Sequence, residues 1–145
     1  LDLVAHIVES GVPVMGHLGL TPQAVHGFGG HKVQGRDEAA ARALIESARR
    51  LADAGCFALV LECVPARLAG CVTAVIDVPT IGIGAGVATD GQVLVLQDML
   101  GTNPEFKPKF LRHYADGFGT IRDAVDRFHA DVQSGAFPAR EESYA

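Results

Sequence analysis

The stretch Cys56-Phe57-Ala58-Leu59-Val60-Leu61-Glu62 decides the fold, because it is the most apolar run of the chain and it ends on a carboxylate. Its apolar residues follow one another without polar alternation, which is typical of a parallel strand that is buried on both faces. Residues 57–62 are therefore predicted to form a central strand. Glu62 then stands at the carboxyl end of that strand.

Three further apolar runs, at residues 12–17, 80–83 and 93–96, have the same continuous character and are predicted to be strands. Residues 37–54 carry an apolar stripe at helical spacing, with Asp37 as a possible N-cap and Gly55 after the C-terminus. Residues 65–75 are predicted to form a second helix, with Pro65 in its first turn. The alternation of strands and helices indicates a parallel sheet with helical cover.

Both ends of the chain are predicted to be helical. Residues 1–10 have the pattern of a helix without an N-cap, and the chain is expected to begin within a fold. Near the other end, Thr120 and Asp123 have the spacing of a capping box and Gly135 marks a stop, which predicts a helix over residues 120–134. The apolar stripe of this helix consists of Ile121, Val125, Phe128 and Val132.

Polar residues at the strand ends favour a barrel over an open doubly wound sheet. His17, Glu62 and Gly84 each follow a different buried strand at its carboxyl end, which is where barrel enzymes gather catalytic groups. A complete (β/α)8 barrel needs roughly 250 residues, so about four strands make half of one. The predicted fold class is α/β of the (β/α)8 TIM-barrel type, with residues 1–145 as a single domain segment that carries only about the second half of the barrel and its C-terminal helices.

Composition indicates a soluble protein that acts on a small molecule. The 145 residues are 48% hydrophobic and 20% charged, which provides enough apolar material for a core. The net charge of −5 comes without a cluster of Lys or Arg, so neither nucleic acid nor a membrane is expected as a partner. No apolar run approaches the roughly 20 residues that span a bilayer and no signal peptide is recognised, so a cytoplasmic location is expected. Cys56, Cys63 and Cys71 are predicted to be reduced thiols.

Glu62 is the leading candidate for a catalytic residue. Burying an ionised carboxylate without a partner costs on the order of several kcal/mol or raises its pKa, and a raised pKa suits a general base near neutral pH. The alternative, a structural ion pair, lacks an Arg or Lys nearby in the sequence. His17 stands among glycines that would expose its ring, which favours substrate contact or proton handling over a core histidine.

The remaining polar motifs have structural alternatives. Residues 82–86, Gly-Ile-Gly-Ala-Gly, lack the third glycine and the following helix of a dinucleotide-binding motif, so they form a turn or allow the backbone to approach a ligand or a strand. Asp90 and Asp98 could bind a metal or orient a base, but turn chemistry for Asp90 and helix capping for Asp98 are favoured. No spacing among the histidines indicates a metal site, and four of them are predicted to be solvated: His26, His31, His113 and His129.

Several motifs in register carry a resemblance to one family. They are Gly16-His17-Leu18-Gly19-Leu20-Thr21-Pro22-Gln23, Lys32-Val33-Gln34-Gly35-Arg36, Leu61-Glu62-Cys63-Val64-Pro65 and Gly82-Ile83-Gly84-Ala85-Gly86. The match extends through Asp90-Gly91-Gln92-Val93-Leu94-Val95, Lys107-Pro108-Lys109-Phe110 and Ser134-Gly135-Ala136-Phe137-Pro138. In this order the motifs closely resemble the ketopantoate hydroxymethyltransferase family. The chain departs from the family pattern at Gln97 and at Glu142-Ser143-Tyr144, where a packing or assembly contact is expected to change.

The resemblance implies an enzyme that transfers a one-carbon unit from 5,10-methylenetetrahydrofolate to α-ketoisovalerate. The product, ketopantoate, leads to pantothenate and coenzyme A. It also implies Mg²⁺ and a homo-oligomer, usually a decamer, with the acidic metal ligands and a substrate-binding lysine in the N-terminal half of the barrel. No metal ligand is therefore expected in this chain. By position in the family motifs, Glu62 is the proton acceptor and His17 contacts substrate.

Two alternatives remain open. A related metal-dependent barrel lyase or mutase that acts on 2-oxo acids would form the same kind of enolate but would not need folate. The second alternative is that the chain by itself is a catalytically incomplete fragment that needs a complementing chain.

Overall fold

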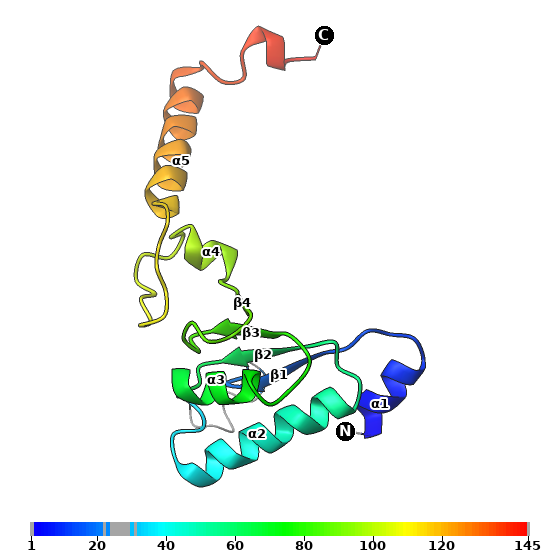
Figure 1. The fold of residues 1–145 in the computed structure, drawn as a ribbon. Coiled ribbons are helices and arrows are strands. Elements are labelled where there is room, and N and C mark those ends of the chain that lie inside the picture. The colour runs from blue at the N-terminus through cyan, green and yellow to red at the C-terminus, as the bar shows by residue number, and fades with distance from the viewer. Residues whose placement is uncertain (1, 22, 24–29, 31, 145) are drawn as a thin grey trace. The chain divides into compact units, whose positions relative to one another are not determined.

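The computed structural model describes residues 2–21, 23, 30 and 32–144 (Figure 1). The chain divides into two compact units, Leu1–Val93 and Leu94–Ala145. The first unit contains a sheet with its helices, and the second contains helices joined by loops. The solvated positions predicted for His26 and His31 lie outside the described residues.

A four-stranded parallel sheet forms the centre of the first unit. Its strands lie in sequence order and are β1 (Met15–Gly19), β2 (Ala58–Glu62), β3 (Thr80–Ile83) and β4 (Gly91–Gln92) (Figure 1). The prediction of a parallel sheet is confirmed, as are the strand that ends at Glu62 and the strand at residues 80–83. The first strand lies later than predicted, because its ladder runs beside β2 from the pair Met15–Ala58 to the pair Gly19–Glu62.

The predicted strand at residues 93–96 is wrong. β4 comes immediately before it, and Val93 adds only one further bond, from its N–H to the Gly82 carbonyl at 3.0 Å. Pairing starts early because the Asp90 carboxylate accepts hydrogen bonds from the backbone N–H and the hydroxyl of Thr80, at 2.8 and 3.0 Å. These two bonds bring the residue after Asp90 alongside β3. The chain then leaves the sheet, so the apolar residues 93–96 do not extend it.

Three helices accompany the sheet: α1 (Asp2–Glu9), α2 (Glu38–Asp53) and α3 (Ala66–Thr73). The predicted N-cap of α2 is confirmed, because the Asp37 carboxylate accepts a hydrogen bond from the Ala40 N–H at 2.8 Å. The predicted stop is confirmed as well, since Gly55 follows the helix with a φ of +94°. The helix predicted at residues 65–75 is present and ends slightly earlier, at Thr73.

Helices α2 and α3 cover one face of the sheet. Leu59 and Leu61 of β2 belong to one buried cluster with residues of α2 and α3, and the β3 residue Thr80 hydrogen-bonds Thr73 of α3 at 2.8 Å. Because side chains alternate along a strand, Val60 and Glu62 point to the opposite face. The strand order agrees, because right-handed crossovers that always advance in one direction place their helices on one side.

The second unit contains α4 (Leu96–Met99), α5 (Gly117–Ser134) and a 3-10 helix (Arg140–Glu142). Helix capping by Asp98 is wrong, because Asp98 lies inside α4 and the N-cap residue is Val95. His129 is exposed as predicted, but the prediction fails for His113, whose Nε2 is buried without a hydrogen-bond partner among the described residues.

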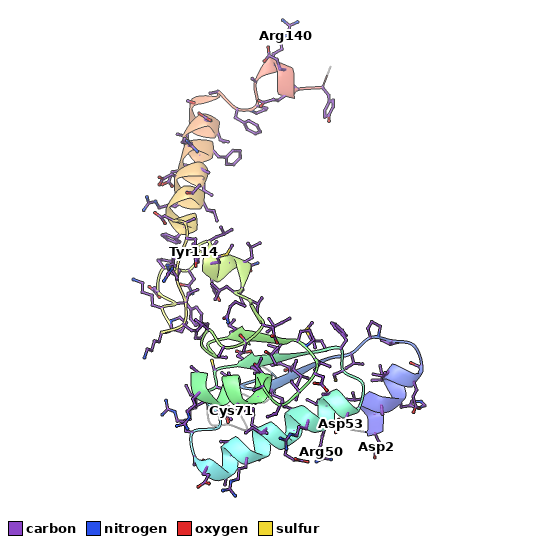
Figure 2. All side chains as sticks on the ribbon, in the orientation of Figure 1. Asp2, Arg50, Asp53, Cys71, Tyr114 and Arg140 are labelled. Atoms are coloured by element: carbon purple, nitrogen blue, oxygen red, sulfur yellow. The ribbon has the colours of Figure 1, made fainter. Side chains whose placement is uncertain are left out.

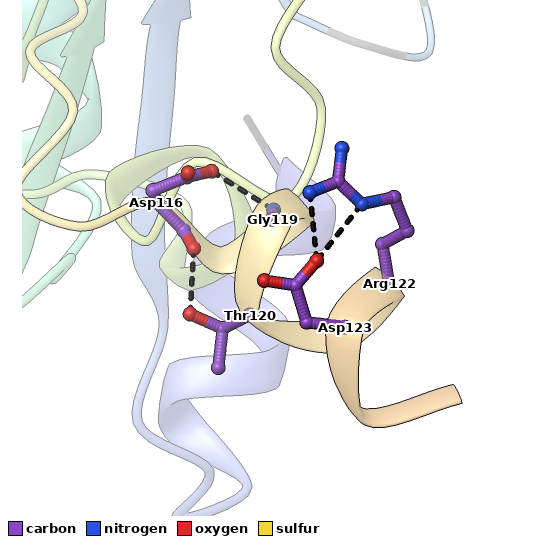
Figure 3. A network of polar contacts seen from close by, with 5 residues as sticks. All are labelled: Asp116, Gly119, Thr120, Arg122 and Asp123. Carbon is purple, nitrogen blue, oxygen red and sulfur yellow. Dashed lines mark hydrogen bonds and ion pairs between the residues drawn. The ribbon is translucent and has the colours of Figure 1, made fainter. Parts of the chain in front are cut away.

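Helix α5 starts earlier than predicted because Asp116 is its cap. Figure 3 shows the Asp116 carboxylate accepting from the Gly119 N–H at 2.9 Å, while the Thr120 hydroxyl donates to the Asp116 carbonyl at 2.8 Å. The predicted capping box is therefore wrong, and Asp123 pairs instead with Arg122 at 2.7 Å. The stop at Gly135 is confirmed by a φ of +72°. The predicted apolar stripe exists but is exposed: Ile121, Val125, Phe128 and Val132.

No helix within the described residues combines the length and the apolar character needed to cross a bilayer.

Open sheet edges generate a prediction about association. In the described residues, β1 and β4 are the end strands, and each leaves one row of backbone groups without a strand partner. We expect the 145-residue polypeptide, expressed alone, to associate or aggregate. Analytical ultracentrifugation checks this, and a well-behaved monomer across a range of protein concentrations would contradict it.

The Asp90–Thr80 contact generates a pH prediction. The hydrogen bonds from Thr80 hold the pKa of Asp90 below its usual value of 3.8, so its stabilisation is present above that pH and is lost as the pH falls through the folded pKa. Asp90→Ala is expected to lower Tm at pH 7, because the fully buried Thr80 loses two acceptor contacts. The difference in Tm from the unsubstituted protein should shrink as the pH falls below 3.8.

Circular dichroism melts at several pH values measure this difference. Asp77→Ala is the matched control, because Asp77 is exposed and has no side-chain hydrogen bond in the described part of the chain. Equal Tm changes for the two variants would show that the contact does not stabilise the fold.

Candidate active site

His17 and Glu62 meet on the face of the sheet opposite α2 and α3. The His17 Nε2 lies 3.0 Å from the Glu62 Oε2, although 45 positions separate the two residues in the sequence. The β1–β2 register explains the contact, since it pairs His17 with Val60 and Gly19 with Glu62, which puts both side chains on the same face. Both predicted site residues are therefore brought together at one point.

The pair is only partly buried. The side chain of His17 is 32% exposed and that of Glu62 is 20% exposed, so a small molecule can reach both groups in this chain. No Arg or Lys lies near Glu62 in the sequence, and its partner in the structure is the His17 imidazole. The imidazole Nε2 lies within hydrogen-bonding distance of the carboxylate Oε2, so the ring can hold the carboxylate in one orientation.

Backbone hydrogen bonds hold the main chain at Glu62 from three segments. The Glu62 carbonyl accepts from the Leu20 N–H, the Cys63 N–H donates to the Ile83 carbonyl, and the Cys63 carbonyl accepts from the Gln34 N–H, each at 2.9 Å. This main chain is thereby tied to the end of β1, to the end of β3 and to the segment before α2. The position of the carboxylate is consequently defined by tertiary contacts.

Cys63 has an unusual backbone conformation directly after Glu62. Its φ of +50° is the only positive value among the described residues other than glycine. The left-handed conformation costs a non-glycine residue about 1–2 kcal/mol, and such strain tends to occur at functional sites. Burial, and secondarily the charge of Glu62, raise the pKa of the Cys63 thiol, so the thiol is neutral near pH 7 and is a poor nucleophile.

The glycine-rich loop after β3 has a packing role. Gly86 has a φ of +79°, and a Cβ there would lie 2.4 Å from the Cβ of Ala66 in α3. The Gln92 side-chain amide donates to the Gly86 carbonyl at 2.8 Å, and to the Thr89 hydroxyl at 2.7 Å. These contacts support the turn interpretation of this loop and the close approach to a neighbouring element.

A magnesium site does not fit the described residues of this chain. They contain no group of three or more His, Cys, Asp or Glu side chains placed to hold a metal. His17 and Glu62 offer one imidazole and one carboxylate, whereas Mg²⁺ takes octahedral oxygen coordination. Asp90 is engaged by Thr80.

A shallow cavity of about 160 Å³ lies between the end of α2 and the segment before β3, and its lining includes neither site residue. The lining residues are Arg49, Ala52, Asp53, Val75, Ile76, Asp77 and Val78. Asp53 and its neighbour Arg50 are labelled on α2 in Figure 2.

A parallel α/β sheet with a carboxylate–imidazole pair at the carboxyl ends of its strands defines a class of protein suited to acid–base chemistry on a small molecule. The sequence profile described as ketopantoate hydroxymethyltransferase matches residues 1–140. The chain belongs to the ketopantoate hydroxymethyltransferase family.

Curated relatives are similar over nearly the whole chain. A 3-methyl-2-oxobutanoate hydroxymethyltransferase of Bdellovibrio bacteriovorus is 61% identical over 145 residues, which are 100% of this chain and 55% of the relative. Proteins of the same name from Francisella tularensis and Coxiella burnetii are 55% and 54% identical, over 99% and 97% of this chain and 54% and 53% of their own lengths. The chain therefore spans about half the length of the curated relatives it matches.

The backbone contacts around Glu62 were not predicted from the sequence. Nothing in the local pattern indicates that Leu20, Gln34 and Ile83 converge on one peptide, because these residues belong to segments that meet only in the folded sheet. The left-handed Cys63 also has no sequence signal, since glycine or asparagine usually marks that conformation. The glycines around His17 were interpreted only as exposing its ring, although a glycine at a strand end can also indicate a close approach of two main chains.

Proposed function

We propose that the protein containing this chain transfers a hydroxymethyl group from 5,10-methylenetetrahydrofolate to α-ketoisovalerate and so forms ketopantoate for pantothenate and coenzyme A synthesis. The observation that carries the proposal is the contact of 3.0 Å between the Glu62 carboxylate and the His17 imidazole at the carboxyl end of β2. The names of the relatives support the same reaction.

Glu62 is proposed as the general base. Its carboxylate removes the proton from the carbon next to the ketone of α-ketoisovalerate, and the electron pair of that C–H bond forms the enolate. The enolate carbon then bonds to the methylene carbon of the folate. Both C–N bonds of that carbon break as it gains this C–C bond and a hydroxyl group from water, and the two folate nitrogens take up one proton from water and one from Glu62. With water as the source of the hydroxyl group, the overall products are ketopantoate and tetrahydrofolate. A positioned base of this kind contributes on the order of 10²–10⁴ in rate.

His17 is proposed to bind the substrate while it orients Glu62. Its Nε2 faces the carboxylate, and its side chain is partly exposed beside the point at which the proton is removed. The imidazole can therefore hold the carboxylate in one rotamer and hydrogen-bond substrate that lies on the same face of the sheet. Mg²⁺, which the family resemblance implies, would be held by residues outside this chain.

We further propose that the sheet is part of a (β/α)8 barrel, with this chain as one domain segment that forms about the second half. Strands in sequence order with helices on one face support a barrel over a doubly wound sheet, in which the strand order reverses and helices cover both faces. We also propose that the protein is a cytoplasmic homo-oligomer, with the decamer that is usual for the family as its expected form.

Glu62→Gln tests the proposed base in the full-length native polypeptide. Solvent deuterium exchange at the α-ketoisovalerate methine, followed by proton NMR, is expected to fall about 10²–10⁴-fold, because the amide cannot accept the proton. Glu46→Gln, a change at an exposed position of α2, is the control and should exchange normally. Exchange by Glu62→Gln at the normal rate would exclude Glu62 as the base.

The same assay separates the alternatives. Ketopantoate formation that requires 5,10-methylenetetrahydrofolate supports the transferase, whereas folate-independent turnover of a 2-oxo acid supports a lyase or mutase. Activity of the 145-residue polypeptide alone would exclude the incomplete-fragment alternative.

His17→Ala tests the proposed substrate contact. We expect a higher KM for α-ketoisovalerate and slower turnover, because substrate loses a hydrogen-bonding group and Glu62 loses its partner. Calorimetric titration with Mg²⁺ should give unchanged metal binding. His129→Ala, at an exposed position of α5, is the matched control. If His17→Ala had the same kinetics as this control, His17 would have a structural role and no substrate contact.

A further inference from the structure

Gly19 lies against the main chain of the proposed base. It ends β1 with a φ of +93°, and a Cβ at this position would lie 2.1 Å from the Glu62 carbonyl oxygen and 2.8 Å from a methyl group of Val64. The next residue, Leu20, donates its N–H to the same carbonyl at 2.9 Å. The end of β1 can approach Glu62 this closely only because position 19 has no side chain.

The opposite side of the same main chain is also constrained. Cys63 adopts its φ of +50°, donates its N–H to Ile83 and accepts from Gln34. The main chain at Glu62 thus lies between Gly19 of β1 and the left-handed Cys63, which is hydrogen-bonded to the end of β3. Gly19 and Cys63, which both contact the main chain of Glu62, therefore both have a positive φ, a backbone conformation that residues with side chains rarely adopt.

The spacing between β1 and β2 at this level controls the carboxylate–imidazole contact. His17 lies two positions before Gly19 on the same strand and reaches Glu62 across the register that pairs Gly19 with Glu62. Any group that separates the two strand ends moves the Glu62 Oε2 away from the His17 Nε2. A displacement of about 1 Å is enough to cost on the order of 10²-fold in rate where geometry matters.

We propose that Gly19 is a positioning residue for Glu62. Because Gly19 has no side chain, the end of β1 can contact the Glu62 carbonyl, and this contact holds the Glu62 carboxylate beside His17. The inference rests on the proposed function, because it treats Glu62 as the base. It adds a residue that touches neither the substrate nor the reacting atoms.

Gly19→Ala tests the inference in the full-length native polypeptide, with Gly55→Ala as a matched control. Gly55 has nearly the same φ, +94° against +93°, and a Cβ there would lie 2.8 Å from a Val8 methyl group on α1, so it shares the backbone strain without contacting Glu62. Both variants should have a lower Tm. Only Gly19→Ala should show methine exchange that is slower by about 10–100-fold per folded molecule.

A crystal structure of each variant supplies a readout that simple destabilisation would not change. The distance from the His17 Nε2 to the Glu62 Oε2 should exceed hydrogen-bonding range in Gly19→Ala and stay near 3.0 Å in Gly55→Ala. If Gly19→Ala does not fold, Cys63→Asn and Cys63→Val replace it, because asparagine tolerates the left-handed conformation and a β-branched residue does not. Cys63→Asn should then exchange at least about tenfold faster than Cys63→Val.

An exchange rate for Gly19→Ala within about twofold of Gly55→Ala, with the His17–Glu62 contact intact, would overturn the inference. Equal methine exchange rates for Cys63→Asn and Cys63→Val would also overturn the inference. Normal exchange by Glu62→Gln is a different result, since it refutes the proposed base, and the measured contact distance in Gly19→Ala still decides whether Gly19 positions that carboxylate.

Discussion

The parallel pairing of β1 with β2 holds His17 and Glu62 on one face of the sheet, and the chemistry that this chain can support depends on that pairing. A shift of one residue in register would turn one of the two side chains toward the helices. The buried contacts of Leu59 and Leu61 with α2 and α3 oppose such a shift, because it would expose both leucines. Hydrophobic packing on the helix side therefore determines polar geometry on the other side.

The face of the sheet opposite α2 and α3 is the second physical feature with functional meaning. Besides the site pair it presents apolar side chains, among them Met15, which is 43% exposed, and Val60. Parallel strands are stable when both faces are covered, so this face of the sheet is suited to packing against further structure. In a barrel the cover comes from the other strands, whose side chains fill the interior.

Local patterns predicted local structure well where the signals were short-range. The N-cap Asp37, the stop at Gly55 and the stop at Gly135 are all interactions within one helical turn, and each was correct. Local patterns gave wrong predictions where the sequence offered two candidate starts for the same helix or strand. Asp116 and Thr120 could both begin α5, and Asp116 is used because its carboxylate reaches the Gly119 N–H. Residues 93–96 have the pattern of a strand, but the contact between Asp90 and Thr80 makes the pairing with β3 begin earlier, at Gly91.

By itself the sequence determined that this is a parallel α/β chain with Glu62 at the end of a buried strand, because apolar periodicity and strand-end polarity are properties of contiguous residues. Only the tertiary structure decided that the partner of Glu62 is His17, that Gly19 lies against its carbonyl and that Cys63 turns left-handed beside it. Those contacts join segments far apart in the chain. Their geometry follows from strand register and close packing, which no local pattern encodes.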